Sequence, residues 1–273
     1  NRYAIMQDMF LGGRRIKQVV NYQRVDELQE IVKEFSYRVT KEECLDLPDK
    51  VYMRREFDMT KEQKKAYEEM RQMAISFFEE GSASTTSVIT QLLRLHQISC
   101  GHLPLDGGKD IIEFENRRLH NLGEVLDETR GKVIIWANYI HDIDNIKKFL
   151  EKKYGLDSFV TYYGRTKDKE RADALQLFQD LDSPVRFFLG NTQTGGYGIT
   201  LTAANTVIYY SNNYDLEKRI QSEDRAHRIG QRNPVTYVDL VCKNTVDEKI
   251  ITALRNKINI ARAITGDDWR QWI

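Results

Sequence analysis

Two arginines, Arg225 and Arg228, stand three residues apart in the segment 221–231, which reads Q-S-E-D-R-A-H-R-I-G-Q. If this segment is helical, both guanidinium groups project from one face. Two planar cations side by side suit a polyphosphate, because each can donate two hydrogen bonds and neutralise charge that develops during phosphoryl transfer. The same spacing also occurs on solvated basic turns of surface helices. The pair by itself leaves both interpretations open.

The composition limits the possible functions of the chain only weakly. The 273 residues are enough for one large or two modest domains. Lys and Arg total 41 and Asp and Glu total 41, so the formal net charge is zero and any contact with nucleic acid must come from a local patch. Three cysteines (Cys44, Cys100 and Cys242) lack C-x-x-C spacing, which favours a reducing compartment and argues against structural zinc.

Neither a membrane span nor a secretion signal is predicted. The sequence contains no apolar run of about 18 residues and no signal-peptide pattern, so we expect a cytoplasmic or otherwise intracellular protein without a membrane partner. The first residue is Asn1 and not Met, which is compatible with a piece of a longer protein.

The elements that must position the arginines fall into two blocks. In the first we expect a helix over 25–39, a strand or extended crossover over 51–59, and helices over 60–81, 88–99 and 119–131. Thr60 and Gln63 form a capping box at the start of the helix over 60–81. His96, His102 and His120 lie in this block without the spacing of metal ligands, which favours structural or surface roles.

The second block alternates strands with helices. The predicted strands are 133–137, 159–163, 185–189, 206–210 and 236–241, and the predicted helices are 142–154, 169–179, 216–228 and 246–264. Short strands that alternate with helices of about 10 to 15 residues indicate a parallel, doubly wound sheet. Ligands bind such sheets at the carboxyl ends of the strands.

Two segments follow predicted strands and could therefore bind a ligand. The segment 190–198 reads G-N-T-Q-T-G-G-Y-G, and its glycines can bring backbone N–H groups close to a phosphate or simply form a tight turn. The segment 211–215 contains Tyr214, which could stack on a base or sugar or cap the core from its rim.

These segments together resemble a known family. The run A-A-N-T-V-I-Y-Y-S-N-N-Y-D-L-E-K-R-I-Q-S-E-D-R-A-H-R-I-G-Q over 203–231 resembles motifs V and VI of the Swi/Snf-type ATPases, the duplex-DNA translocases of helicase superfamily two. The runs K-V-I-I-W-A-N-Y over 132–139 and N-T-Q-T-G-G-Y-G-I-T-L over 191–201 are similar to further motifs of that family. The resemblance extends over nearly the whole chain.

The resemblance implies an α/β fold: a RecA-like, P-loop-NTPase-type parallel sheet flanked by helices, with an inserted helical protrusion. The implied parts are the end of a first lobe with an interlobe linker over 1–59, the protrusion over 60–131, a second RecA-like lobe over 132–245, and a bracing helix over 246–273. In such motors ATP and Mg²⁺ bind between two lobes. The phosphate loop and the Mg²⁺ ligands belong to the first lobe, so no metal ligand is expected in this chain.

The resemblance also assigns roles to residues. Arg225 and Arg228 would be arginine fingers that reach the β- and γ-phosphates of ATP. The residues implied at the ATP site or interlobe face are Gln221, Gly195, Gly196 and Asp224, and those implied at DNA are Thr192, Gln193 and Tyr214. Asp224 and His227 would tie motif VI to neighbouring motifs. Because the family usually has a cation where Gln193 stands, we expect a weaker and less salt-dependent grip on phosphate there.

One motif is absent from the sequence. The pattern G-x-x-x-x-G-K-[ST] does not occur, and G-G-K-D over 107–110 fails its spacing and lacks the hydroxyl that would hold Mg²⁺. Without that cradle an arginine finger has no phosphate to stabilise. We therefore predict a C-terminal lobe of an ATP-hydrolysing, monomeric duplex-DNA translocase or helicase that is inactive without its first lobe. The alternative is a non-catalytic module that binds DNA or protein.

Overall fold

The centre of the protein is a parallel sheet of six strands. The computed structural model describes residues 2–11, 14–37, 44–79, 85–105, 110–195 and 198–265. The strand order is β3-β10-β9-β6-β8-β7, and every neighbouring pair is parallel. The strands are β3 (Lys50–Phe57), β6 (Lys132–Trp136), β7 (Phe159–Tyr162), β8 (Phe187–Gly190), β9 (Ala204–Tyr209) and β10 (Val235–Cys242). The predicted α/β fold is confirmed.

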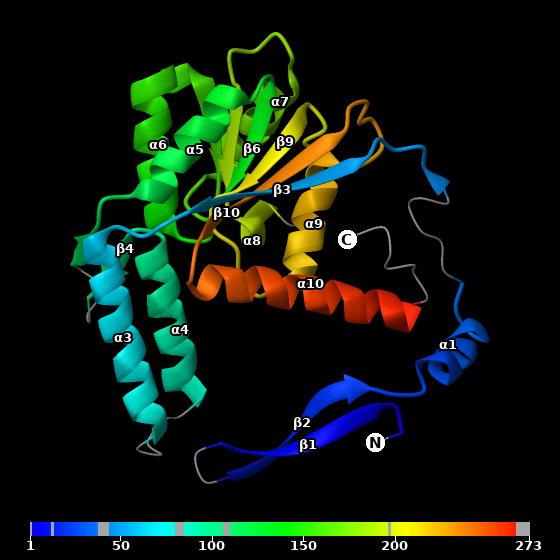
Figure 1. The fold of residues 1–273 in the computed structure, drawn as a ribbon. Coiled ribbons are helices and arrows are strands. Elements are labelled where there is room, and N and C mark those ends of the chain that lie inside the picture. Colours follow the sequence, from blue (N-terminus) through cyan, green and yellow to red (C-terminus); the bar gives the residue numbers. More distant parts are fainter. Residues whose placement is uncertain are drawn as a thin grey trace.

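Helices cover both faces of the sheet (Figure 1). On one face lie α5 (Arg117–Glu128) and α6 (Ile140–Tyr154), and on the other lie α7 (Asp168–Gln179) and α9 (Leu216–Ala226). The central strand β6 packs against both layers: Val133 and Ile135 belong to the core under α5 and α6, whereas Ile134 and Trp136 belong to the core under α7 and α9. This two-sided burial is why β6 reads as a continuous apolar run.

A pair of helices, α3 (Lys61–Glu79) and α4 (Thr85–Ser99), projects away from the sheet (Figure 1). The capping box at the start of α3 is confirmed: the Thr60 amide donates to Gln63 Oε1 at 3.1 Å, and the Gln63 amide donates to Thr60 Oγ1 at 3.2 Å. Tyr67 and Ile98 pack with Val246 at the start of α10 (Val246–Thr265). After α4 the chain forms a hairpin of β4 (His102–Pro104) and β5 (Ile111–Glu113), which the sequence pattern does not predict.

The segment before the protrusion holds a hairpin, a short helix and a sheet strand. Strands β1 (Ala4–Leu11) and β2 (Arg14–Tyr22) pair antiparallel. Helix α1 (Val25–Lys33) ends earlier than predicted. Strand β3 settles the choice left open for 51–59, because it pairs with β10 as an edge strand of the sheet.

Two details near the candidate site differ from expectation. The helix predicted over 216–228 ends at Ala226, with His227 as its C-cap, so Arg228 lies beyond the helix. The loop after β8 contains a short helix, α8 (Thr192–Gly195), while Gly196 lies outside the described residues. The remaining element is a 3-10 turn over Leu156–Ser158. Across the described part of the chain, the helices are all too short or too polar to span a membrane.

Candidate nucleotide and nucleic-acid site

The two arginines lie at the amino edge of the sheet. Helix α9 begins after the carboxyl end of β9 and runs back across the sheet, so its C-terminal end approaches the start of β9 and β10. The Leu201 amide donates to the Arg225 carbonyl at 2.9 Å, and Gln231 Nε2 donates to the Ala204 carbonyl at 2.8 Å. The rule that ligands lie at carboxyl ends therefore does not locate Arg225 and Arg228.

Both guanidinium groups converge on one carbonyl oxygen. Nη1 of Arg225 donates to the carbonyl of Ile199 at 3.4 Å, and Nη1 of Arg228 donates to the same oxygen at 3.2 Å. Because Arg228 lies beyond the end of the helix, the two arginines do not share a helical face. The shared acceptor brings them together. Burial, followed by the charge of Arg228, lowers the pKa of Arg225. The pair thus concentrates positive charge that an anion such as phosphate would neutralise.

Two of the other residues expected at the ATP site lie along the same segment. Gln221 and Asp224 are partly exposed, and Nε2 of Gln221 donates to Oε1 of Glu217 one turn earlier at 2.9 Å. Gly195 closes α8. The structure brings Gln221 and Asp224 close to the arginines along the chain and leaves Gly195 at the end of a separate element.

The inner face of α9 carries a buried ion-pair network that the sequence analysis did not identify. Arg219 donates from Nε to Glu223 Oε1 at 2.9 Å and from Nη1 to Asp239 Oδ1 of β10 at 2.6 Å. Nη1 also donates to Asn212 Oδ1 at 2.7 Å. Burial disfavours the charge on Arg219, but the surrounding Asp239, Tyr209 and Glu223 outweigh it and raise the pKa of Arg219. This network fixes α9 on the sheet.

Two further contacts hold the end of the arginine segment. His227 Nε2 lies 2.7 Å from the carbonyl of Pro48, to which it can donate. Gln231 donates from Nε2 to the carbonyls of Ala204 and Ala226, at 2.8 and 3.1 Å. Between them, Gly230 has φ of 100°, a backbone region that residues with side chains rarely adopt. The conformation of the turn after α9 is therefore fixed by these side-chain contacts and by Gly230.

The residues expected at DNA lie on the opposite, carboxyl edge of the sheet. Thr192 and Gln193 open α8 after β8, and the Gln193 amide donates to Asn191 Oδ1 at 2.7 Å. Nδ2 of Asn191 in turn donates to the Asn138 carbonyl after β6, at 2.9 Å. Tyr214 follows β9 and is 40% exposed. These side chains share one edge, as expected for segments that follow parallel strands.

The described residues fit a phosphate better than a metal ion. Guanidinium groups pair with phosphate oxygens, and Arg225 and Arg228 supply two of them. In the part of the chain that the structure describes, no group of three or more His, Cys, Asp or Glu side chains could hold a metal ion. The guanidinium groups present thus fit a phosphate group.

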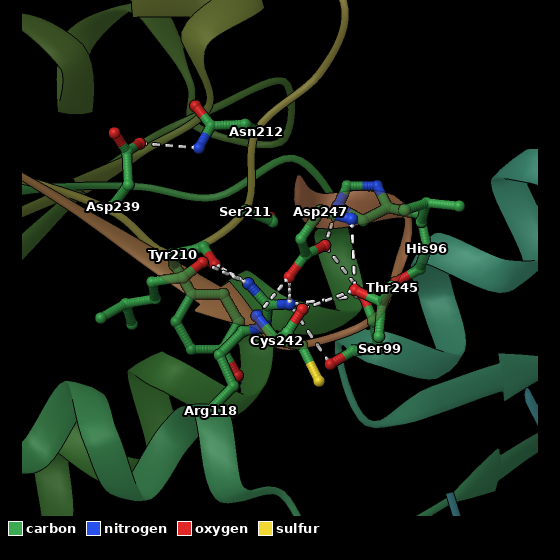
Figure 2. Close-up of polar contacts among 12 residues, drawn as sticks. His96, Ser99, Arg118, Tyr210, Ser211, Asn212, Asp239, Cys242, Thr245 and Asp247 are labelled. Atoms are coloured by element: carbon green, nitrogen blue, oxygen red, sulfur yellow. Dashed lines mark hydrogen bonds and ion pairs between the residues drawn. The ribbon is translucent and has the colours of Figure 1, made fainter. Parts of the chain in front are cut away.

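A second buried network joins the protrusion to the sheet (Figure 2). The guanidinium of Arg118 is 1% exposed and forms an ion pair with Asp247 at the start of α10. It also donates to the carbonyl of Tyr210 at 2.6 Å and to that of Ser99 at 3.3 Å. His96 Nε2 lies 3.3 Å from Asp247 Oδ1, which confirms a structural role for this histidine. Arg118, which is on α5, therefore links α4, the residue that follows β9, and α10.

Comparisons with known proteins give the class first. The profile described as "Helicase conserved C-terminal domain" matches residues 117–230, which include the sheet from β6 to β9 and the arginine segment. Residues 117–230 are therefore similar to helicase C-terminal domains.

Individual relatives then narrow the class. The chain is 32% identical over 167 residues to the "Chromatin-remodeling ATPase INO80" of Homo sapiens, covering 60% of this chain and 10% of that protein. It is 28% identical over 271 residues to an uncharacterized ATP-dependent helicase of Mycoplasma genitalium, covering 95% of this chain and 26% of that protein. This chain therefore spans between a tenth and about a quarter of these relatives.

A solved structure agrees with the sequence relatives. The Sulfolobus solfataricus SWI2/SNF2 ATPase core in complex with dsDNA superimposes with a TM-score of 0.60 at 28% identity, covering 89% of this chain and 53% of that one. These matches support a C-terminal lobe of the Swi2/Snf2 type of helicase-like ATPases, as the motifs predict.

Proposed function

We propose that this chain is the C-terminal motor lobe of an ATP-dependent duplex-DNA translocase and that Arg225 and Arg228 act as its arginine fingers. The observation that carries the proposal is the convergence of both Nη1 atoms on the Ile199 carbonyl, which holds two cations together at a solvent-accessible edge. The relatives are ATP-dependent helicases or ATPases, and the Sulfolobus solfataricus structure holds dsDNA.

The proposed chemistry needs a second lobe. ATP bound between two lobes supplies the γ-phosphate that is transferred to water, and Mg²⁺ on the first lobe supplies charge neutralisation there. The role of this chain is to place two guanidinium groups on the phosphate oxygens as the cleft closes. Thr192, Gln193 and Tyr214 would meet duplex DNA at the other edge of the sheet. The chain by itself is expected to hydrolyse no ATP.

The test uses the chain joined to its first lobe. For Arg225→Ala and Arg228→Ala we expect DNA-stimulated ATP turnover to fall by on the order of 10³-fold, with nucleotide binding much less affected. The matched control is Arg71→Ala on α3, where the guanidinium is exposed and pairs only with Glu68 among the contacts described. Near-wild-type turnover in both variants would contradict the assignment of Arg225 and Arg228 as arginine fingers and favour a non-catalytic binding module.

A further inference from the structure

The chain enters the sheet at a segment that is bonded to the arginine segment. Pro48 accepts from His227 Nε2 at 2.7 Å, immediately before β3. Within β3, Tyr52 donates its hydroxyl hydrogen to Glu223 Oε2 at 2.7 Å, and Lys50 Nζ donates to the same oxygen at 3.3 Å. Three contacts therefore join Pro48–Tyr52 to α9 and its C-cap, across more than 170 residues of sequence.

These contacts are buried and charged. The Glu223 side chain is 7% exposed, and that of Lys50 is 22% exposed. Burial, followed by the negative charge of Glu223, raises the pKa of Tyr52, so its hydroxyl stays protonated and keeps donating. Hydrogen bonds to a charged group in a poorly solvated place are among the stronger ones in proteins.

The two anchored residues alternate with the arginines along the chain. Glu223 stands two residues before Arg225, and His227 directly precedes Arg228. The anchors point toward β3 and the residues before it, whereas both guanidinium groups reach the Ile199 carbonyl. Because β3 is paired along its whole length with β10, it is a rigid support for them.

We propose that Glu223 and His227 are positioning residues: anchored on Pro48–Tyr52, they set where Arg225 and Arg228 point, so the chain entering at Pro48 is part of the arginine machinery. This inference rests on the proposed function of the arginines. It predicts that weakening the anchor lowers the rate of the chemical step more than it weakens ATP binding, because the phosphate contacts matter most in the transition state.

A matched control exists on the same helix. The Tyr209 hydroxyl lies 2.6 Å from Ser222 Oγ and is fully buried, so it anchors α9 to β9 and not to β3. Tyr52→Phe and Tyr209→Phe each remove one hydroxyl that bonds to α9. Only Tyr52→Phe acts on the contact with the entering segment.

The first experiment uses the chain alone and measures backbone hydrogen exchange of both variants. We expect Tyr52→Phe to speed exchange of amides in 223–231, and Tyr209→Phe to act mainly on the turn around Ser222. Unchanged exchange over 223–231 in Tyr52→Phe would overturn the anchoring, whatever the function of the arginines.

The second experiment uses the chain joined to its first lobe. We expect Tyr52→Phe to lower kcat about tenfold while the KM for ATP changes by less than about twofold, and Tyr209→Phe to leave kcat near wild type. In an Arg228→Ala background, Tyr52→Phe should have little further effect on kcat, since both changes act through one group. Equal losses of kcat in the two tyrosine variants, or full additivity in the Arg228→Ala background, would overturn this inference but leave the proposed function of the arginines standing. Unimpaired turnover in Arg225→Ala and Arg228→Ala would remove the proposed function, and this inference with it.

Discussion

Arg225 and Arg228 bring two positive charges to one acceptor. One carbonyl oxygen accepts from both guanidinium groups, and burial together with Arg228 lowers the pKa of Arg225. The charge of Asp224 opposes this lowering, and a phosphate would add further negative charge and several acceptor oxygens. The electrostatics of the pair therefore favour an anion at this edge.

Gln193 offers a direct test of the expected DNA edge. Gln193→Lys adds a cation at an exposed position where a phosphate contact is expected, so binding of duplex DNA should become tighter and more dependent on salt. The slope of log K against log salt should steepen by about 0.9, the value for one additional phosphate neutralised. Fluorescence anisotropy with a labelled duplex at several salt concentrations measures this slope.

Gln176→Lys is the control for the Gln193 experiment. It adds the same charge at an exposed position of α7, away from the Thr192 segment. If both variants steepen the slope equally, the effect comes from net charge and the proposed contact at Gln193 is wrong.

Some of the important residues could be predicted from the sequence and others could not. The arginine pair is visible because its motif is local. Glu223 and Arg219 were missed because their partners, Tyr52 and Asp239, lie far away in the sequence. One signal was available: Asp239 stands in the otherwise apolar strand Thr236–Val241, and a carboxylate buried in such a strand requires a cationic or hydrogen-bonding partner.

Helix α9 shows how one element connects the two edges of the sheet. It begins beside Tyr214 at the carboxyl edge and ends beside Arg225 at the amino edge. The crossover helix of a parallel sheet must run against the strands, so its two ends always face opposite edges. A site at its C-terminal end therefore faces a different edge of the sheet from Tyr214, which precedes its N-terminal end.

The capping box at the start of α3 should have a measurable effect on stability. Thr60→Ala removes the acceptor of the Gln63 amide in a buried position, and we expect the free energy of unfolding to fall by about 1 kcal/mol. Denaturation in urea measures the change. Thr60→Ser keeps the hydroxyl and should remain close to wild type, and a loss as large as that of Thr60→Ala would contradict the capping explanation.

Among the helices and strands, those with strong local sequence patterns were predicted well. The buried strand at 133–137 and the helices over 60–81 and 142–154 were recovered because apolar periodicity marks them. The hairpin of β4 and β5 was missed because each strand has three residues, too few to show a period. The place of β3 in the sheet depends on pairing with β10, which no local pattern records.

At the scale of the whole molecule, stability should depend on His96. This histidine is buried between α4 and α10, and burial lowers its pKa below the ordinary value of 6.5 although Asp247 opposes the change. On unfolding the pKa returns to its ordinary value, so the unfolded chain binds more protons just below that pH. The free energy of unfolding should therefore fall as the pH drops through about 6.5 toward about 5.

His96→Gln should flatten this pH dependence. Urea denaturation between about pH 7 and about pH 5 measures it, because the protonation difference at this site disappears with the imidazole. His120→Gln serves as the control, since that side chain is 75% exposed. If His96→Gln keeps the wild-type slope, the buried imidazole does not carry the effect.

The acceptor shared by Arg225 and Arg228 belongs to the main chain, at Ile199. No exchange of the side chain at this position deletes that oxygen, so a substitution scan would rank the position only by how well the new side chain packs. Selection can act on this contact only through the path of the backbone. Gly198, directly before Ile199, has a φ of 68°. Comparisons of side chains therefore do not reveal the Ile199 carbonyl, which brings the two arginines together. Replacing its peptide bond by an ester would be the chemical way to change this acceptor.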